Sequence, residues 1–158
     1  PQPLLHHDIK SANVLLFASG HPRLTAKLSD FGLAVGVSGA STAVATTRTK
    51  THAAGGTFAY RAPETFSDKY TTASEVYSYA IVLWELLTGQ KPWFRQADGR
   101  PYMDANVYHL VANRKKRPEV PSTIDKKNAL AALMKRCWAH EPKKRPTFEE
   151  LSKTLGEM

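Results

Sequence analysis

Apolar and polar positions near the N-terminus follow the pattern of a β-hairpin. A short apolar stretch runs from Asn13 to Phe17, turn-forming residues follow at 19–22, and apolar and polar residues alternate from Leu24 to Leu28. Two short runs of this kind separated by turn residues are typical of paired antiparallel strands. The sequence therefore predicts a hairpin over residues 13–28.

The period becomes helical from Ser74 onward. Apolar residues recur there at steps of three and four, at Val76, Tyr79, Ala80, Leu83, Leu86 and Leu87. Val82 and Trp84 make the segment apolar nearly all round, and Gly89 follows as a typical helix end. A helix that is apolar on all faces belongs in a protein core. We therefore expect a central buried helix here.

Three further helical patterns follow in the C-terminal half. They run from about Asp104 to Lys116, from Lys126 to Trp138 and from Phe148 to Leu155. Pro118 ends the first, and Thr147 is a suitable N-cap for the last. Between Val35 and Gly56, by contrast, small residues and Ser/Thr dominate. Such a segment is typical of a functional lid, a binding loop or disorder.

Composition narrows the class of protein. The chain has 158 residues, 42% of them hydrophobic, which fits one domain or part of one and argues against a disordered chain. Its single cysteine, Cys137, cannot form an internal disulfide, so a reducing compartment is favoured. The densest apolar stretch, Ala80 to Leu87, is far shorter than the roughly 20 residues of a membrane span. No secretion signal opens the sequence.

The formal net charge is +8. Basic residues cluster at 114–117, at 126–127 and at 143–145. A nucleic-acid or anionic-membrane surface is one interpretation of these clusters, and solvated helix ends and loops are the other. The second is favoured, because no aromatic residues are interleaved with the charges.

Two short motifs carry chemically active residues. In the first, His6-His7-Asp8-Ile9-Lys10-Ser11-Ala12-Asn13, an Asp is followed by a Lys two residues on and an Asn five residues on. One short loop could thus accept a proton, neutralise a phosphate and hold a metal. In the second, Asp30-Phe31-Gly32, a carboxylate able to bind a hard cation follows a predicted strand. Gly32 permits a sharp turn after it.

Two more motifs follow in order, and the four together resemble a known family. They are Gly56-Thr57-Phe58-Ala59-Tyr60-Arg61-Ala62-Pro63-Glu64, and Cys137-Trp138 followed by Glu141-Pro142 and Arg145-Pro146. The chain resembles the C-terminal lobe of a eukaryotic protein kinase. In having Lys10 in the first motif, the chain resembles serine/threonine kinases. The central helix with Cys137-Trp138 resembles the tyrosine-kinase-like group of these enzymes.

The resemblance implies an α+β, mainly α fold: a helical C-terminal lobe with a small β-hairpin beside the catalytic loop. Residues 1–158 would form that lobe, with a catalytic loop at 6–13, an activation segment at 30–64 and a helical body at 74–155. The N-terminal lobe is absent from this sequence, and we expect it to be an intramolecular partner. Without its glycine-rich loop, lysine and glutamate we expect the isolated chain to be inactive.

The resemblance also implies roles for single residues. Asp8 would be the base that orients the acceptor hydroxyl, and Lys10 would stabilise the transferring phosphoryl group of ATP. Asn13 and Asp30 would hold two magnesium ions, and Thr57 would hydrogen-bond towards Asp8 and Lys10. The resemblance also implies structural roles: Glu64 and Arg145 would form a buried ion pair, and His6 would pack beneath Phe31.

Two residues depart from the family pattern. His7 stands where most kinases have an arginine that grips a phosphate on the activation loop, so we expect weak dependence on phosphorylation there. Glu75 replaces an aspartate that braces the catalytic loop. Its extra methylene either pushes that hydrogen bond out of register or is absorbed by a small shift.

The predicted function is a serine/threonine protein kinase in signal transduction, seen as a truncated catalytic domain. Its expected partners are ATP, Mg²⁺ and a protein substrate with a Ser or Thr acceptor, with no nucleic acid and no membrane insertion by this segment. The expected location is the cytoplasm or the cytoplasmic face of a membrane. The alternative is a non-catalytic, pseudokinase-like binding module. A tyrosine kinase is disfavoured by Lys10.

Overall fold

The computed structural model describes residues 4–18, 24–36, 57–94, 100, 102–124 and 128–158. Its strands form two small antiparallel pairs: β1 (Leu4–Leu5) with β4 (Val35–Gly36), and β2 (Val14–Ala18) with β3 (Leu24–Leu28). Val14 lies opposite Leu28 and Ala18 opposite Leu24, so the predicted hairpin is confirmed. Apart from β4, the Ser/Thr-rich segment from Val35 to Gly56 lies outside the described residues.

The helix α1 (Thr72–Thr88) is the central helix that the apolar pattern predicts. Its side chains at Tyr77, Ala80 and Ile81 are fully buried. Gly89 ends it in the left-handed conformation, with φ of 65°, and the Gly89 N–H donates to the Glu85 carbonyl at 2.8 Å. A residue with positive φ at this position is the usual helix stop, and glycine adopts it at least cost.

The next helical segment is shorter than its pattern predicts. The helix α2 (Asp104–Tyr108) continues as a π-helical turn, η5 (His109–Asn113), and does not reach Lys116. Lys115 has a φ of 53°, and the Lys116 N–H donates to the Leu110 carbonyl at 2.8 Å. A left-handed residue just after a helix turns the chain away from the helical path, so the helical segment ends here. The prediction was therefore wrong beyond Asn113.

Two capped helices complete the C-terminal half. Asn128 caps α3 (Ala129–Cys137) by accepting a hydrogen bond from the Ala131 N–H at 2.9 Å. The predicted start at Lys126 lies outside the described residues. For α4 (Phe148–Gly156) the predicted N-cap is confirmed, because the Thr147 hydroxyl accepts from the Glu150 N–H at 3.2 Å. The Glu150 carboxylate accepts in return from the Thr147 N–H at 2.8 Å.

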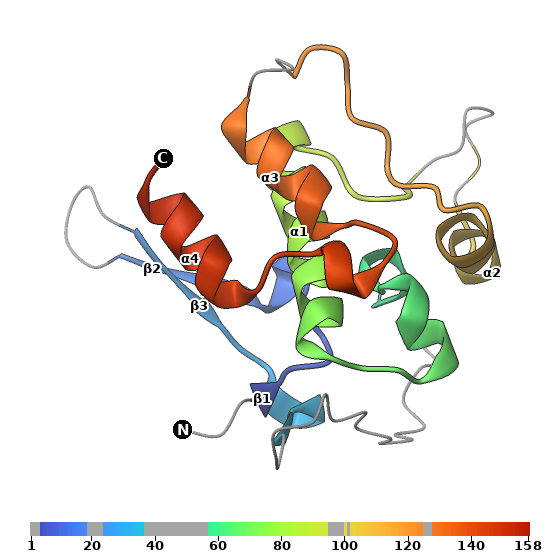
Figure 1. Cartoon of the computed structure of the whole chain (residues 1–158), viewed down its shortest axis with the longest axis horizontal. Coiled ribbons are helices and arrows are strands. Elements are labelled where there is room, and N and C mark those ends of the chain that lie inside the picture. The colour runs from blue at the N-terminus through green and yellow to red at the C-terminus, as the bar shows by residue number, and fades with distance from the viewer. Residues whose placement is uncertain (1–3, 19–23, 37–56, 95–99, 101, 125–127) are drawn as a thin grey trace.

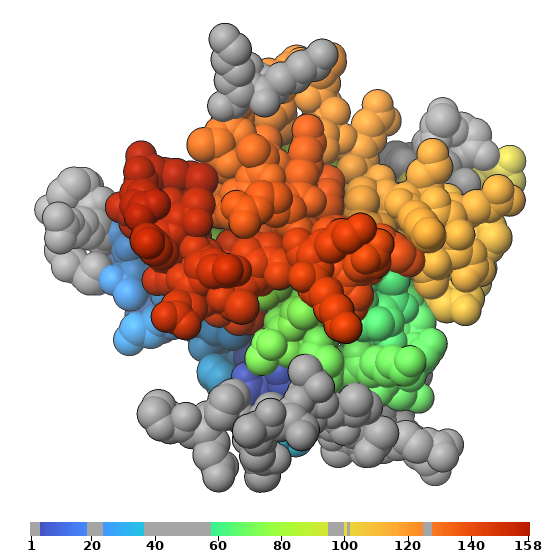
Figure 2. Space-filling view, viewed as in Figure 1, coloured from blue at the N-terminus to red at the C-terminus, as the bar shows by residue number. Residues whose placement is uncertain are grey.

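Short 3-10 turns link these elements: η1 (Ser11–Asn13), η2 (Phe31–Leu33), η3 (Thr57–Tyr60), η4 (Pro63–Ser67) and η6 (Pro142–Lys144). Figure 1 shows α1 in the middle of the molecule with α3 beside it, the β2–β3 hairpin on one side and α2 on the other. In the space-filling view (Figure 2) the C-terminal third of the chain covers most of α1. The fold is α+β and mainly α, as expected.

The β2–β3 hairpin is apolar and exposed. Both strands of the β2–β3 hairpin present large apolar side chains to solvent: Leu15, Leu16, Phe17, Leu24 and Leu28. In the described part of the chain, no helix is long and apolar enough to cross a bilayer.

Candidate active site

Three of the predicted site residues are in direct contact. The Lys10 ammonium donates to the Asp8 Oδ2 at 2.6 Å. The Asn13 amide donates to the same Oδ2 at 3.1 Å and to the Asp8 carbonyl at 2.8 Å. Asp8 and Asn13 are buried, whereas the Lys10 side chain is 25% exposed. We call Asp8, Lys10 and Asn13 the Asp8 cluster. A cation and a carboxylate are therefore in contact within one short loop.

His6 connects this cluster to the segment that carries Asp30. Its Nδ1 accepts from the Asp8 N–H at 3.3 Å, and its Nε2 lies 2.9 Å from the Ser29 carbonyl. A neutral imidazole with the proton on Nε2 satisfies both contacts. The His6 ring also meets the Phe31 ring edge-on, with centroids 4.9 Å apart. The predicted packing of His6 against Phe31 is confirmed.

Asp30 joins the Asp8 cluster through its neighbour. Both the backbone N–H and the hydroxyl of Ser29 donate to the Asn13 carbonyl, at 2.8 and 2.9 Å. Asp30 itself has a φ of 63°, and its Oδ1 accepts from the Gly32 N–H at 3.4 Å. This left-handed residue turns the chain sharply at the end of β3, and its carboxylate is exposed. The backbone at Thr57 begins η3, while its side chain lies outside the described residues.

Asn13 and Asp30 supply the type of atom that a hard cation prefers. The Asn13 side chain donates through Nδ2, which leaves Oδ1 as its acceptor atom. Together with the exposed Asp30 carboxylate, this gives an amide oxygen and a carboxylate on adjoining segments. Mg²⁺ binds through one or two such oxygens while keeping several waters. The residues present therefore fit a magnesium ion.

Glu75 reaches the loop from α1 despite its extra methylene. Its two carboxylate oxygens accept from the His6 and His7 N–H groups, each at 3.0 Å. The side chain is buried, and this burial raises the pKa of Glu75, an effect that the two backbone N–H groups partly offset. The added methylene is therefore absorbed by a small shift and does not push the hydrogen bond out of register.

The His7 ring packs against a neighbouring aromatic ring in this conformation. It stacks on Tyr70, with centroids 4.6 Å apart, and its Nε2 is buried without a partner in the described residues. Burial lowers the pKa of His7, and His6 lowers it further. Its φ of 65° turns the backbone so that both His6 and His7 N–H groups face Glu75. His7 is therefore a neutral, packed side chain at neutral pH.

Tyr60 forms a link that the sequence did not predict. Its hydroxyl donates to the Glu85 carboxylate at 2.9 Å and lies 3.3 Å from the Ser11 hydroxyl. Burial is the main reason that the pKa of Tyr60 is raised to about 12. Tyr60 thus ties the third motif both to the loop of the Asp8 cluster and to α1. Tyr60 could be singled out because it lies in the third motif, but nothing in the sequence pattern indicated Glu85 as its partner.

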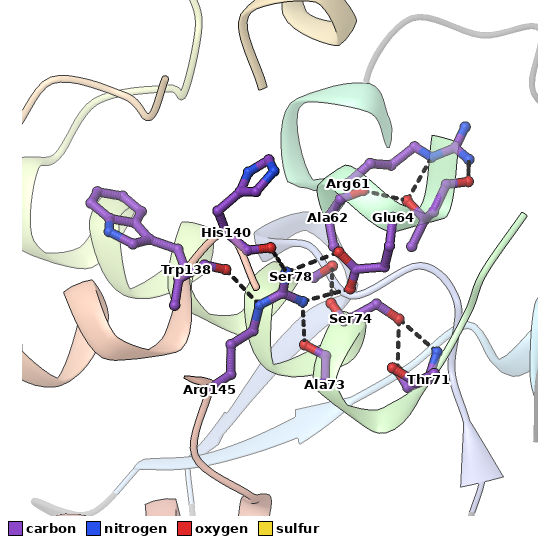
Figure 3. A network of polar contacts seen from close by, with 12 residues as sticks. Arg61, Ala62, Glu64, Thr71, Ala73, Ser74, Ser78, Trp138, His140 and Arg145 are labelled. Carbon is purple, nitrogen blue, oxygen red and sulfur yellow. Dashed lines mark hydrogen bonds and ion pairs between the residues drawn. The ribbon is translucent and has the colours of Figure 1, made fainter. Parts of the chain in front are cut away.

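The predicted ion pair of Glu64 with Arg145 is confirmed, and it lies inside a larger network (Figure 3). The guanidinium meets both carboxylate oxygens of Glu64, at 2.6 and 2.9 Å. Its other donors reach the carbonyls of Ala73, Ala139 and His140 at 2.8, 2.8 and 3.1 Å. All five N–H donors of Arg145 are satisfied, and its side chain is 0% exposed.

The comparisons with known proteins identify the family. Residues 1–155 match the family model for protein tyrosine and serine/threonine kinases. Since this match spans nearly the whole chain, the chain belongs to the protein kinase family.

Individual relatives agree with this assignment. The chain is 39% identical over 156 residues to human receptor-interacting serine/threonine-protein kinase 3, which covers 93% of this chain and 27% of that protein. It is 34% identical over 160 residues to a mitogen-activated protein kinase kinase kinase of Drosophila melanogaster, covering 98% and 12%. It is 35% identical over 154 residues to the serine/threonine-protein kinase CTR1 of Arabidopsis thaliana, covering 97% and 16%. The chain spans less than a third of each of these relatives. It resembles the tyrosine-kinase-like group of serine/threonine kinases.

Proposed function

We propose that the chain is the C-terminal lobe of a serine/threonine protein kinase that transfers the γ-phosphoryl group of ATP to protein substrates in signal transduction. The observation that carries this proposal is the Asp8 cluster, in which a buried carboxylate contacts a cation at 2.6 Å and an amide at 3.1 Å. The names of the relatives support a Ser or Thr hydroxyl as the acceptor. Lys10 supports the same acceptor.

Each residue of the site has a role in this proposal. Asp8 accepts the hydroxyl proton or orients the hydroxyl towards the phosphorus, while Lys10 neutralises charge on the transferring phosphoryl group. Asn13 and Asp30 hold Mg²⁺, and Thr57 hydrogen-bonds towards Asp8 and Lys10. When bound, Mg²⁺ neutralises phosphate charge. The contact between Asp8 and Lys10 holds the carboxylate in place before substrate arrives.

We propose the following division of residues 1–158: a catalytic loop at 6–13, an activation segment at 30–64 and a helical body at 74–155. An N-terminal lobe would supply the glycine-rich loop, the lysine and the glutamate that complete the ATP site. Because phosphoryl transfer depends on positioning from both sides, we expect the isolated chain to show no ordinary kinase turnover. The exposed apolar side chains of the β2–β3 hairpin are consistent with a covering partner of this kind.

A mutation in the full-length gene product tests the catalytic role. Asp8→Asn removes the proton acceptor but keeps the shape of the side chain, so transfer of radiolabelled phosphate from ATP to a generic Ser/Thr substrate should fall at least about a hundredfold. Asp104→Asn, at the start of α2 and outside the Asp8 cluster, is the matched control and should leave the rate unchanged.

The alternative is a non-catalytic binding module. This alternative would be favoured if the full-length protein showed no kinase activity while its Asp8→Asn variant had a normal melting temperature. That result would refute the catalytic proposal. Phosphotyrosine as the product would overturn the choice of acceptor.

The position of His7 supports weak dependence on activation-loop phosphorylation. A neutral histidine stacked on Tyr70 lacks the charge and fork geometry that an arginine offers to a phosphate. Phosphatase treatment of the full-length protein should therefore change its turnover little. A collapse of turnover after this treatment would contradict the interpretation. For its location, we propose the cytoplasm or the cytoplasmic face of a membrane, where ATP and protein substrates meet.

A further inference from the structure

A concave surface lies beside the C-terminal end of α1, and none of its lining residues belongs to the Asp8 cluster. Its volume is about 840 Å³, within the range in which protein pockets hold ligands. The chain that leaves α1 and the segment that leads to α3 (Figure 1) both line it. We call this surface the α1-end groove. Its lining includes Trp84, Lys91, Trp93, Tyr102, Lys116 and Glu119.

The base of the α1-end groove is aromatic and well supported. Trp84 is 3% exposed, and its indole N–H donates to the Glu119 carbonyl at 2.9 Å, which fastens the segment at 116–119 to α1. Trp93 and Tyr102 pack edge to face, with ring centroids 5.5 Å apart. These contacts hold the rings in place, so an apolar side chain entering the groove would meet a preformed surface.

Trp93 has two unusual features. Its φ is 55°, a left-handed conformation that is costly for a bulky residue and that is found preferentially at functional sites. Its indole Nε1 is buried and has no hydrogen-bond partner in the described residues. Buried donors normally have a partner. An acceptor from a bound molecule, such as a carbonyl or carboxylate oxygen, would satisfy this one.

The rim of the groove is basic. Lys91 and Lys116 are exposed at it, and Arg117 lies beside them, held by hydrogen bonds to the carbonyls of Trp138 and Lys116 at 2.8 and 2.7 Å. Glu119 is the only acidic residue among the described lining residues. The residues at 116–117 belong to the basic cluster that stood out in the sequence. A basic rim around an aromatic base favours an anionic partner that also carries an apolar group.

We propose that the α1-end groove is a docking site for an acidic peptide segment of a partner protein, with an aromatic or large aliphatic side chain among its Asp and Glu residues. The apolar side chain would pack on Trp93 and Tyr102, the carboxylates would face Lys91 and Lys116, and a peptide oxygen would accept from Trp93 Nε1. A single-stranded nucleic acid fits less well, because Trp93 and Tyr102 pack against each other rather than offering separate stacking faces. The proposal does not depend on the catalytic function.

Peptide binding tests the proposal directly. The probe is a fluorescein-labelled peptide of sequence Gly-Asp-Glu-Phe-Glu-Asp-Gly, titrated with the protein and followed by fluorescence anisotropy. Replacing its Phe by Ala, or its four acidic residues by Lys, should weaken binding at least about tenfold. Lys116→Glu should weaken it about fivefold or more, because charge attraction at the rim becomes repulsion.

Two variants separate docking in the groove from general charge attraction. Lys153→Glu makes the same charge change on exposed α4, outside the groove, and should leave binding nearly unchanged. Trp93→Phe removes Nε1 but keeps an aromatic ring, and should weaken binding several-fold while circular dichroism stays the same. Undetectable binding of the acidic aromatic peptide, equal effects of Lys116→Glu and Lys153→Glu, or tighter binding of a labelled oligothymidine would each overturn the proposal.

Discussion

At the scale of single residues, burial decides how the ionisable groups behave. Glu75 is 6% exposed, and its carboxylate has exchanged water for the backbone N–H groups of His6 and His7. Cys137 is fully buried in the core. For both groups, removal from water raises the pKa. For Glu75 the result is a dependence of stability on pH, and for Cys137 it is an unreactive thiol.

The raised pKa of Glu75 gives its stability effect a definite sign. The folded protein holds the Glu75 proton more tightly than the unfolded chain does, so the free energy of unfolding falls as the pH rises from about 4.5 through the raised pKa. In that window the slope is at most about 1.4 kcal/mol per pH unit. The Glu75→Gln variant has no titrating carboxyl at this position, so its free energy of unfolding lacks this pH dependence. Urea unfolding of both proteins between pH 4 and 7 should show the wild type losing stability relative to the variant. A constant difference across that range would contradict the prediction.

Cys137 should be inert in the folded protein. Burial raises the pKa of its thiol to about 11, so almost no thiolate exists at pH 8. Ellman's reagent should therefore react with the native protein at least about a hundred times more slowly than with the protein in guanidinium chloride. The chain has one cysteine, so the absorbance reports on this site alone. Similar rates in the two states would contradict the packing of Cys137 in the core.

At the scale of elements, helix ends determine where the chain turns. Gly89 after α1 and Lys115 after η5 both have positive φ, at 65° and 53°, and each lets the chain leave its helix sharply. Both segments then border the α1-end groove. Only the first of these ends has the residue type that identifies it in a sequence. A lysine in the left-handed conformation carries no such signal.

Gly89→Ala should destabilise the protein by about 1 kcal/mol. A Cβ at this position would meet no atom within 4 Å, so the cost comes from the backbone conformation alone. Gly156→Ala is the matched control, since Gly156 lies in α4 with equally open space and without a positive φ, and alanine favours a helix. Urea midpoints should move in opposite directions for the two variants. A shift of the same sign and size in both would contradict the argument.

At the scale of the whole molecule, buried polar groups join segments that are distant in sequence. Glu64 and Arg145 are 81 residues apart and connect η4 to the loop before α4. The guanidinium of Arg145 also lies over the Tyr77 ring, 5.1 Å from its centroid, and that of Arg117 lies 4.9 Å from the same centroid. Tyr77 is fully buried in α1. The centre of the fold therefore contains two guanidinium groups packed on one aromatic ring, and the Glu64 carboxylate pairs with one of them.

Breaking this ion pair should be costly. Arg145→Ala leaves the Glu64 carboxylate without its partner and should lower the free energy of unfolding by about 3–5 kcal/mol. Lys144→Ala is the control, because its pair with Glu141 is exposed to solvent and should contribute nothing measurable. If Arg145→Ala does not fold, Glu64→Gln keeps the shape and one acceptor, and its smaller loss still gives a readout. An Arg145→Ala midpoint equal to that of Lys144→Ala would refute the structural role.

The sequence by itself determined the local elements and much of the candidate site. The alternation over residues 13–28, the apolar helix that ends at Gly89 and the cap at Thr147 depend on neighbours within a few residues. The same holds for the Asp8 cluster, whose three members lie within one short loop and are in contact. Short-range patterns of this kind are readable because geometry over a few residues follows from backbone period and turn chemistry.

The tertiary structure decided which distant groups meet. Whether Glu75 could reach the loop, that Tyr60 would bond to Glu85, and that the segments at 89–94 and 116–119 would enclose a groove all depend on how α1 packs in the core. The Glu75 and Tyr60 contacts join residues that are 69 and 25 positions apart. Each of them depends on small differences in the distance between packed elements. No local pattern encodes distances on that scale, because they result from the packing of the whole core.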